Sequence, residues 1–308
     1  ATTNDGNVVQ VSSDFRTEKS ENTPPPFVLT EEEQIWNALC LGTRDYVKKN
    51  GFTDVCLGLS GGIDSAIVAA IACDAIGPEH VHAIMMPSRF SSTHSVSDAQ
   101  ALINNLKCHQ MNIPIGPAHD AFLKMTEEYF ADLPKGITEE NIQSRLRALL
   151  LMAVSNKFGN MLISTSNKSE SAVGYSTLYG DMSGGFAPLK DVWKTDVVGL
   201  CNWRNKNKPQ SSKYPKLDII PSNIIVKPPT AELRENQKDS DSLPDYKILD
   251  EILIKIIEEE ASLESIISSG HDSEIVHRVY RLLLLSCLLY TSDAADEGLG
   301  VDLGGRRI

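Results

Sequence analysis

Residues 55–77, VCLGLSGGIDSAIVAAIACDAIG, decide the fold of this chain. An apolar run stops at a serine and two glycines, and a second apolar run begins after Asp64 and Ser65. The first run has the length of a buried strand, and the second predicts a helix from Ser65 to Ile76 with a face of small residues. In a parallel sheet, a turn between such elements lies at the carboxyl edge, where ligands bind.

The residues of this turn are suited to binding a phosphate. Gly61 and Gly62 let the backbone approach a ligand and adopt positive φ. Backbone N–H groups at the helix N-terminus form an anion site, to which Ser60 and Ser65 add hydroxyl groups. Asp64 would repel a phosphate, so we expect Mg²⁺ beside it. The spacing fits neither the dinucleotide fingerprint nor the P-loop, and an ordinary strand-to-helix turn remains the alternative.

Strands and helices continue to alternate beyond this turn. Strands are expected within 80–87, 109–115 and 160–166, and helices over 30–51, 95–107 and 138–159. The alternation predicts an α/β protein with a doubly wound parallel sheet, which we expect to be five-stranded. Amphipathic C-terminal helices are expected within 245–270 and 272–286, and a polar surface loop, inserted between elements, over 205–217.

Composition restricts the class of protein and its partners. The chain has 308 residues, of which 41% are hydrophobic and 23% charged, as in a globular protein with a sizeable core. The net charge of −12 argues against nucleic acid and membrane surfaces as partners. The six cysteines are scattered singly, as expected of buried thiols in a reducing compartment, and this predicts a cytoplasmic protein. No apolar run approaches the ~18 residues that span a bilayer.

Several stretches together resemble one family of enzymes. SGGIDS (60–65) resembles the pyrophosphate-binding loop of the N-type ATP pyrophosphatases, which have an adenine nucleotide alpha hydrolase-like fold. Residues 164–195 closely resemble the signature of the NAD synthetases within that superfamily. Four more stretches agree with this family in the same order: MMPSR (85–89), TEENIQSR (138–145), KPPTAELR (227–234) and DSLPDY (241–246). The resemblance covers about residues 30–286 and favours the long, glutamine-dependent form.

The resemblance implies a reaction and its participants. An NAD synthetase amidates deamido-NAD to NAD through a nicotinate adenylate, releases AMP and pyrophosphate, and uses ATP, Mg²⁺ and ammonia. In the long form a glutaminase domain supplies the ammonia, and the family usually forms homo-oligomers. Two alternatives stay open: a truncated fragment that binds ATP–Mg²⁺ with little turnover, and another amidating ATP pyrophosphatase such as GMP synthetase. The stretch GYSTLYGDMSGGFAPLKDV (174–192) speaks against GMP synthetase.

The resemblance also implies roles for individual residues. Asp64 and Lys194 match catalytic positions, and Asp64 and Glu170 match the two magnesium carboxylates. Asn141, Arg145 and Glu170 match contacts to deamido-NAD. The positions that match ATP contacts are Gly58, Leu59, Ser60, Gly61, Gly62, Ile63, Asp64, Ser65, Thr165, Lys194 and Thr230.

Each of these assignments has a simpler alternative. Glu170 could simply be an acid at a helix start, favoured by the helix dipole. Lys194 could be a solvated helix lysine. Asn141 and Arg145 could belong to an ordinary polar helix face. Arg89 and Ser91 follow an expected strand and are weaker candidates for substrate contact. Three contacts of the short, ammonia-dependent form have no counterpart, because the chain has Met85, Leu178 and Gly185 at those positions.

The two ends of the chain depart from the family. Residues 1–29 contain TPPP, lack periodicity and are expected to be the remains of a connection to the missing glutaminase domain. Residues 287–308 replace the basic segment that ends the long form. Back-translation of CLLYTSDAADE and VDLGGRRI fits consecutive parts of a transposon-type sequencing adaptor. We therefore expect the native gene to be cut at about Ser286, with a native glycine-rich tail as the alternative.

Overall fold

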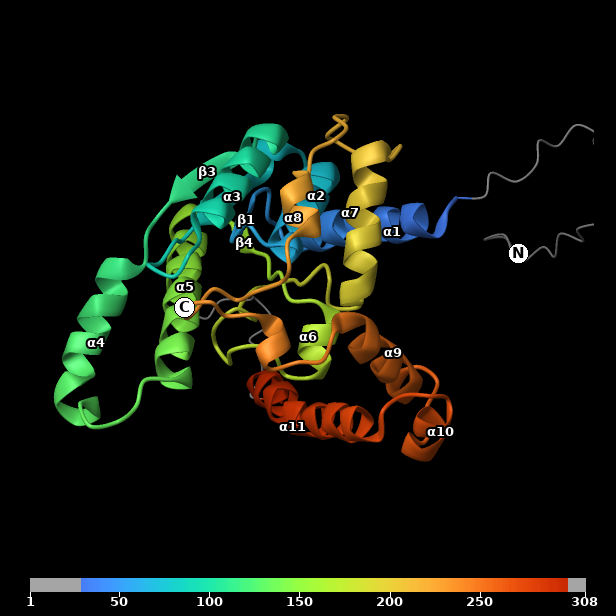
Figure 1. Cartoon of the computed structure of the whole chain (residues 1–308). Coiled ribbons are helices and arrows are strands. Elements are labelled where there is room, and N and C mark those ends of the chain that lie inside the picture. The colour runs from blue at the N-terminus through green and yellow to red at the C-terminus, as the bar shows by residue number, and fades with distance from the viewer. Residues whose placement is uncertain (1–28, 299–308) are drawn as a thin grey trace, which may run out of the picture. The chain divides into compact units, whose positions relative to one another are not determined.

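The computed structural model describes residues 29–298, and for 287–298 it describes the backbone alone. The described residues from Glu31 onward group into one compact unit (Figure 1). The predictions made for residues 1–28 and 299–308 lie outside the described part. Within that part, no helix is long and apolar enough to cross a membrane.

A parallel sheet with the strand order β3-β2-β1-β4 lies at the centre of this unit. β1 (Val55–Gly58) pairs on one side with β2 (Val81–Met85) and on the other with β4 (Met161–Leu162). β3 (His109–Asn112) pairs with the outer edge of β2. The parallel sheet and its α/β class are therefore as predicted, and β1 lies at an inner position, where both of its faces are covered.

The expected strand number was wrong, since the described sheet has four strands and not five. Next to β4 there is only an isolated parallel bridge, between Ile163 and Phe186. Gly184 and Gly185 precede Phe186 and Pro188 follows it. Glycine weakens a strand and proline lacks the N–H group that a ladder needs, so pairing here does not extend beyond one bridge.

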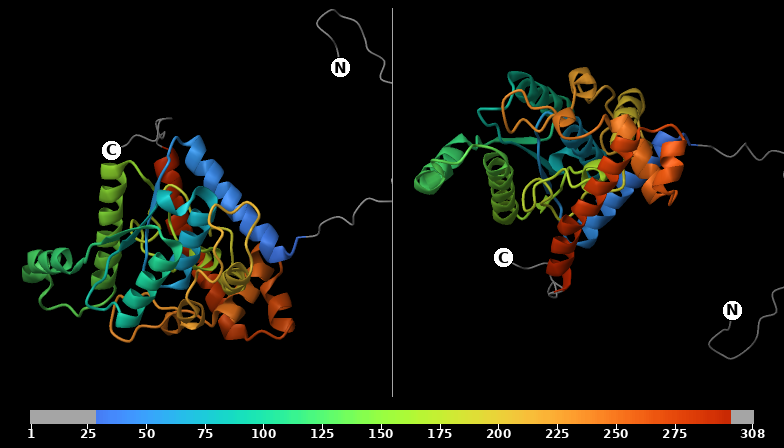
Figure 2. Two further views of the ribbon diagram at one scale, coloured as in Figure 1. Left: turned by 90° about the horizontal axis from the view of Figure 1, so that it is seen from above. Right: turned by 60° about the horizontal axis from the view of Figure 1, so that its bottom comes forward.

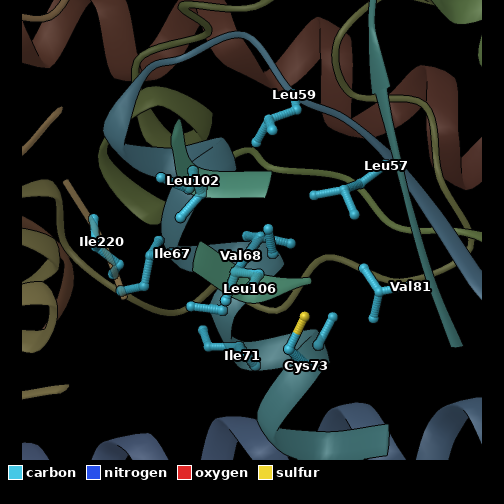
Figure 3. Close-up of a cluster of buried hydrophobic side chains, with 14 of the residues drawn as sticks. Leu57, Leu59, Ile67, Val68, Ile71, Cys73, Val81, Leu102, Leu106 and Ile220 are labelled. Carbon is cyan, nitrogen blue, oxygen red and sulfur yellow. The ribbon is translucent and has the colours of Figure 1, made fainter. Parts of the chain in front are cut away.

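The core on one face of the sheet is formed around α2 (Ile63–Ile76). Almost every residue of α2 is buried, which explains its five alanines: small side chains let a helix pack on all sides. Figure 3 shows Leu57 of β1 and Leu102 of the next helix lying around Ile67 and Val68. The helices that share this core are α1 (Glu31–Lys49), α3 (Thr93–Leu106), α7 (Lys194–Lys206) and α8 (Ser222–Val226).

The other face of the sheet is covered by α5 (Ile137–Phe158), which packs against α4 (Gly116–Phe130). Cys56, Ile84 and Leu162 point to this face, whereas the neighbouring Leu57 points to the α2 side. This alternation follows from the two-residue period of a strand. Figure 2 shows α4 and α5 on the opposite side of the sheet from α1 and α7.

The C-terminal helices form a second core. α9 (Tyr246–Ile257), α10 (Leu263–Ser268) and α11 (Ser273–Gly298) pack together and cover α6 (Lys168–Ala172). Two short 3₁₀ turns, Pro78–His80 and Asp239–Asp241, complete the described elements. α11 continues past Ser286, but the structure describes only its backbone there. The adaptor origin of residues 287–308 therefore stays a prediction.

The expected surface loop is confirmed over 207–217, which contains no helix or strand and is mostly exposed. Residues 205 and 206 instead belong to α7, and Pro209 and Tyr214 of the loop are buried. Tyr214 is only 8% exposed and belongs to the α2 core. Arg204, fully buried in α7, donates hydrogen bonds to the carbonyl oxygens of Asn207, Tyr214 and Lys216. A buried guanidinium needs acceptors for its five donors, and the loop carbonyls supply three of them.

Candidate active site

The turn between β1 and α2 is held by its own hydroxyl groups. Ser65 Oγ donates to the carbonyl oxygen of Gly62 at 3.0 Å, and it lies 3.1 Å from Ser60 Oγ. The backbone N–H of Gly62 donates to Ser60 Oγ at 3.1 Å. These bonds fix the turn at the N-terminus of α2, where backbone N–H groups and the helix dipole favour an anion.

Gly61 is required by the shape of this turn. Its φ is +84°, and a Cβ at this position would lie 2.2 Å from the carbonyl oxygen of Ser95 in α3. A real contact never approaches this distance, and the neighbour is backbone, which cannot rotate away. Gly61 therefore lets the loop lie directly against the first turn of α3.

Two carboxylates and one ammonium group meet beside the turn. Lys194 Nζ donates to Asp64 Oδ2 and, at 3.0 Å, to Glu170 Oε1. Asp64 Oδ1 also accepts a hydrogen bond from Asn167 Nδ2 at 3.0 Å. Lys194 is 7% exposed, which contradicts the alternative of a solvated helix lysine. Residues separated by 130 positions in the sequence thus form one ion-paired cluster.

The cluster shifts the titration of its members. Burial and then the neighbouring Asp64 raise the pKa of Glu170 to about 7, although Lys194 acts in the opposite direction. Burial alone would lower the pKa of Lys194, but Asp64 and Glu170 raise it above the ordinary lysine value. The lysine therefore carries its charge at neutral pH, and it partly neutralises a pair of acids that would otherwise repel each other.

Asp64 and Glu170 fit a magnesium ion by their chemistry. Mg²⁺ is usually held by one or two carboxylates together with water and the phosphates of a substrate. The two carboxylates contact the same ammonium group, so their oxygens converge on one small region. The described residues contain no group of three or more acidic, histidine or cysteine side chains poised for a metal.

A cavity of about 290 Å³ joins this cluster to the ends of the strands. Most of the residues matched to ATP contacts line it: Gly58, Leu59, Ser60, Gly62, Ile63, Asp64, Ser65, Thr165, Lys194 and Thr230. Glu170 and Ser91 line it as well. Gly61 does not, because it packs against α3 instead. The structure thus gathers residues from segments distant in sequence into one concave site.

Three other candidates lie outside the lining of this cavity. Asn141 Oδ1 accepts a hydrogen bond from Thr177 Oγ1 at 3.1 Å, and Arg145 Nε donates to the carbonyl oxygen of Leu178 at 3.1 Å. Arg145 is exposed on α5, so its role in binding deamido-NAD stays a prediction. Arg89 lies 3.4 Å from His119 Nδ1 and borders a separate depression.

Several polar residues of the site were missed from the sequence. Asp239 is 5% exposed, lines the cavity, and accepts hydrogen bonds from Tyr175 and Tyr246. The Tyr246 ring lies 5.2 Å from Lys194 Nζ. Tyr246 is the last residue of the DSLPDY stretch, so the sequence did contain an indication that this residue belongs to the site. Asp239 carried none, because it lies in an irregular polar segment.

A second missed group anchors the segment around Thr230. Glu232 accepts hydrogen bonds from Ser92 Oγ and Ser95 Oγ at the N-terminus of α3, at 2.9 and 2.6 Å. Lys227 Nζ pairs with the same carboxylate at 3.1 Å. These bonds attach one wall of the cavity to α3.

The fold and the site together define the class of protein. A parallel sheet with the order 3-2-1-4, a glycine-containing turn that opens a buried helix, and paired carboxylates beside it are features of the ATP pyrophosphatase fold. Residues 35–286 match the family model described as NAD synthase. The chain belongs to the NAD synthase family.

Sequence relatives agree with this family. The chain is 47% identical over 275 residues to the glutamine-dependent NAD(+) synthetase of Rhodobacter capsulatus, covering 89% of this chain and 49% of that protein. It is 49% identical over 252 residues to the enzyme of the same name from Thermotoga maritima, covering 82% and 42%. The chain thus spans about half the length of these relatives. GMP synthetase is not supported by this family match.

Solved structures agree as well. The glutamine-dependent NAD+ synthetase of Acinetobacter baumannii, in complex with ADP, has a TM-score of 0.61 at 44% identity, covering 85% of this chain and 45% of that one. The NMN synthetase of Francisella tularensis has a TM-score of 0.70 at 25% identity, covering 85% and 96%.

Proposed function

We propose that this chain is the synthetase part of a glutamine-dependent NAD synthetase, a carbon–nitrogen ligase that amidates deamido-NAD to NAD. The observation that carries the proposal is the meeting of Asp64, Glu170 and Lys194 beside the phosphate-binding turn, in a chain of the NAD synthase family. This arrangement suits a reaction in which phosphate charge must be held while the adenylyl group of ATP is transferred and pyrophosphate leaves.

The reaction has two balanced steps. A nicotinate carboxylate oxygen forms a bond to the α-phosphorus of ATP while the bond from that phosphorus to the bridging oxygen breaks, and pyrophosphate leaves with the electron pair. Ammonia then forms a bond to the carboxyl carbon, loses a proton, and displaces AMP. The carboxylate needs this activation because a free carboxylate is a poor acyl donor.

The residues of the site have distinct roles in the proposal. The backbone of the 60–62 turn and the N-terminus of α2 bind the phosphates that leave. Asp64 and Glu170 would hold Mg²⁺, which supplies charge stabilisation on the phosphate oxygens when bound. Lys194 places a buried positive charge next to them. Thr165 and Thr230 lie on separate segments of the lining and contact the nucleotide, while Asn141 and Arg145 hold deamido-NAD.

We also propose partners and a location for the chain. The remaining half of the relatives' length is assigned to a glutamine-hydrolysing domain. Homo-oligomer formation is supported by apolar side chains exposed on α4 and α5: Met125, Tyr129, Leu149 and Phe158, each 61% exposed or more. A cytoplasmic location is supported by the free thiols of the described cysteines.

Isotope transfer tests the proposed chemistry. Deamido-NAD labelled with ¹⁸O in the nicotinate carboxylate is incubated with the chain, ATP, Mg²⁺ and ammonia. One labelled oxygen should appear in the phosphate of AMP, because the carboxylate oxygen that attacks phosphorus leaves with it. NAD formed together with unlabelled AMP would contradict the adenylate. ATP binding without NAD or pyrophosphate would support the alternative of a fragment that binds ATP–Mg²⁺ with little turnover.

A further inference from the structure

Arg147 of α5 is a cation that lines the nucleotide cavity with most of its donors unused. Its Nε donates to the carbonyl oxygen of Met86 at 3.2 Å. No ion pair joins it to a described side chain, and its two Nη groups donate no hydrogen bond within the described part. Neither Nη belongs to the buried polar atoms that lack a partner, so both are accessible, and Arg147 is part of the cavity lining.

The other two cations of the described lining are already neutralised. Lys194 is held between Asp64 and Glu170. Lys227 pairs with Glu232 and donates to Ser95. Arg147 therefore differs from both in that its charge is available to an incoming ligand.

The surroundings of Arg147 favour an anion at this place. Burial lowers the pKa of Arg147 to about 10, although Glu232 and Asp181 act against this shift from a distance. The guanidinium still carries its charge at neutral pH. A half-buried charge that forms no ion pair is unfavourable, and an anion bound directly to it lowers that cost.

The position of Arg147 indicates which part of a nucleotide it would meet. One turn further along α5, Leu151 lies with Met86 around Gly58, and they form an apolar stretch suited to a base. The 60–65 turn, at the end of β1, is the phosphate-binding part of the same cavity. A nucleotide whose base lies on the apolar stretch and whose last phosphates lie at the turn has its α-phosphate between them.

We propose that Arg147 is a catalytic residue whose two Nη groups donate to the α-phosphoryl oxygens of ATP. The assignment rests on the proposed amidation for the identity of the reacting nucleotide. As the carboxylate oxygen forms its bond to the α-phosphorus and pyrophosphate leaves, the α-phosphoryl oxygens stay negatively charged. A planar guanidinium fork holds two such oxygens at once, which a lysine cannot do.

Calorimetric titration of the full chain with ATP, AMP and adenosine tests this contact. In Arg147→Met, binding of AMP and ATP should weaken roughly 10- to 100-fold, because a charge-assisted pair of hydrogen bonds is lost. Adenosine should bind within about twofold of the wild-type affinity. Lys157→Met removes an exposed cation from the same helix and should change none of the three affinities. Arg147→Lys should fall between the wild type and Arg147→Met.

Two results would overturn the assignment: unchanged AMP binding in Arg147→Met, or a loss for adenosine as large as that for AMP. Thermal unfolding shows whether Arg147→Met folds, and if it does not, Arg147→Lys is judged by the same ratio of AMP to adenosine affinity. A failure of the proposed amidation can be distinguished from a failure of the Arg147 contact. If wild-type chain binds AMP through Arg147 but forms no NAD, the reaction is wrong and the contact stands.

Discussion

At the scale of single residues, Gly61 has the strictest requirement in the site. Two separate conditions meet there: a left-handed backbone and a direct contact with the carbonyl oxygen of Ser95. Gly159, which ends α5, meets the first condition alone, since its φ is +72° and nothing lies within 4 Å of the point that a Cβ would occupy. Alanine substitutions at Gly61 and at Gly159 therefore separate the effect of backbone strain from that of steric overlap.

Gly159→Ala should reduce the free energy of unfolding by about 1–2 kcal/mol, the cost of left-handed backbone for a residue with a Cβ. Gly61→Ala should cost more than this and should also weaken ATP binding, because α3 and the turn must move apart. Chemical denaturation and ATP titration of both variants measure this. Equal destabilisation of the two, with ATP binding kept in Gly61→Ala, would contradict the steric account.

Asp64 is expected to act in chemistry more than in folding. Asp64→Asn keeps the shape of the side chain and the acceptor for Asn167, but it removes a metal-binding charge. Pyrophosphate release should fall by roughly 100-fold or more, while the melting temperature stays near that of the wild type. Asp45→Asn, on the exposed face of α1, is the matched control. Unchanged turnover of Asp64→Asn at limiting Mg²⁺ would remove Asp64 from the metal site.

At the scale of elements, α2 and α7 are joined by an ion pair at each end. Asp64 and Lys194 pair at their N-terminal ends, and ten residues further along both helices Asp74 pairs with Arg204. The second pair is fully buried, with Arg204 Nε and Nη2 donating to the two carboxylate oxygens at 2.6 and 3.0 Å. Asp74 also accepts from Trp36 Nε1 of α1 at 2.9 Å. This pair fixes the register that brings Lys194 to Asp64.

Arg204→Met should lower the free energy of unfolding by about 3–5 kcal/mol, because it leaves Asp74 charged and buried without its partner. Lys49→Met breaks an exposed pair with Asp45 and should cost at most about 1 kcal/mol. Urea denaturation compares the two. A loss below about 1 kcal/mol in Arg204→Met would show that the buried pair does not hold the helices together.

At the scale of the whole molecule, local patterns predicted the elements better than their contacts. The turn at 60–65 and the alternating strands were predictable, because buried strands and helix starts leave signals within a few residues. The number of strands was predicted wrongly. Phe186 forms a single bridge beside β4, because the flanking glycines and Pro188 prevent a fifth strand there. Arg147 and Asp239 were missed because their roles depend on contacts between segments far apart in sequence.

The nitrogen source belongs to this scale as well. The purified 308-residue chain should form NAD with ammonia and should not form it with glutamine alone, since the described part contains a single sheet domain matched to the synthetase family. NAD measured with each donor in turn checks this. Glutamine-supported formation of NAD by the pure chain would contradict it.

The most direct test of the central claim is a steady-state balance of products from ATP, deamido-NAD and ammonia with the wild-type chain. NAD, AMP and pyrophosphate should form in equal amounts, and sustained pyrophosphate release should stop when either deamido-NAD or ammonia is left out. Formation of ADP and inorganic phosphate instead, or steady pyrophosphate release without deamido-NAD, would contradict the assignment of this site to NAD synthesis.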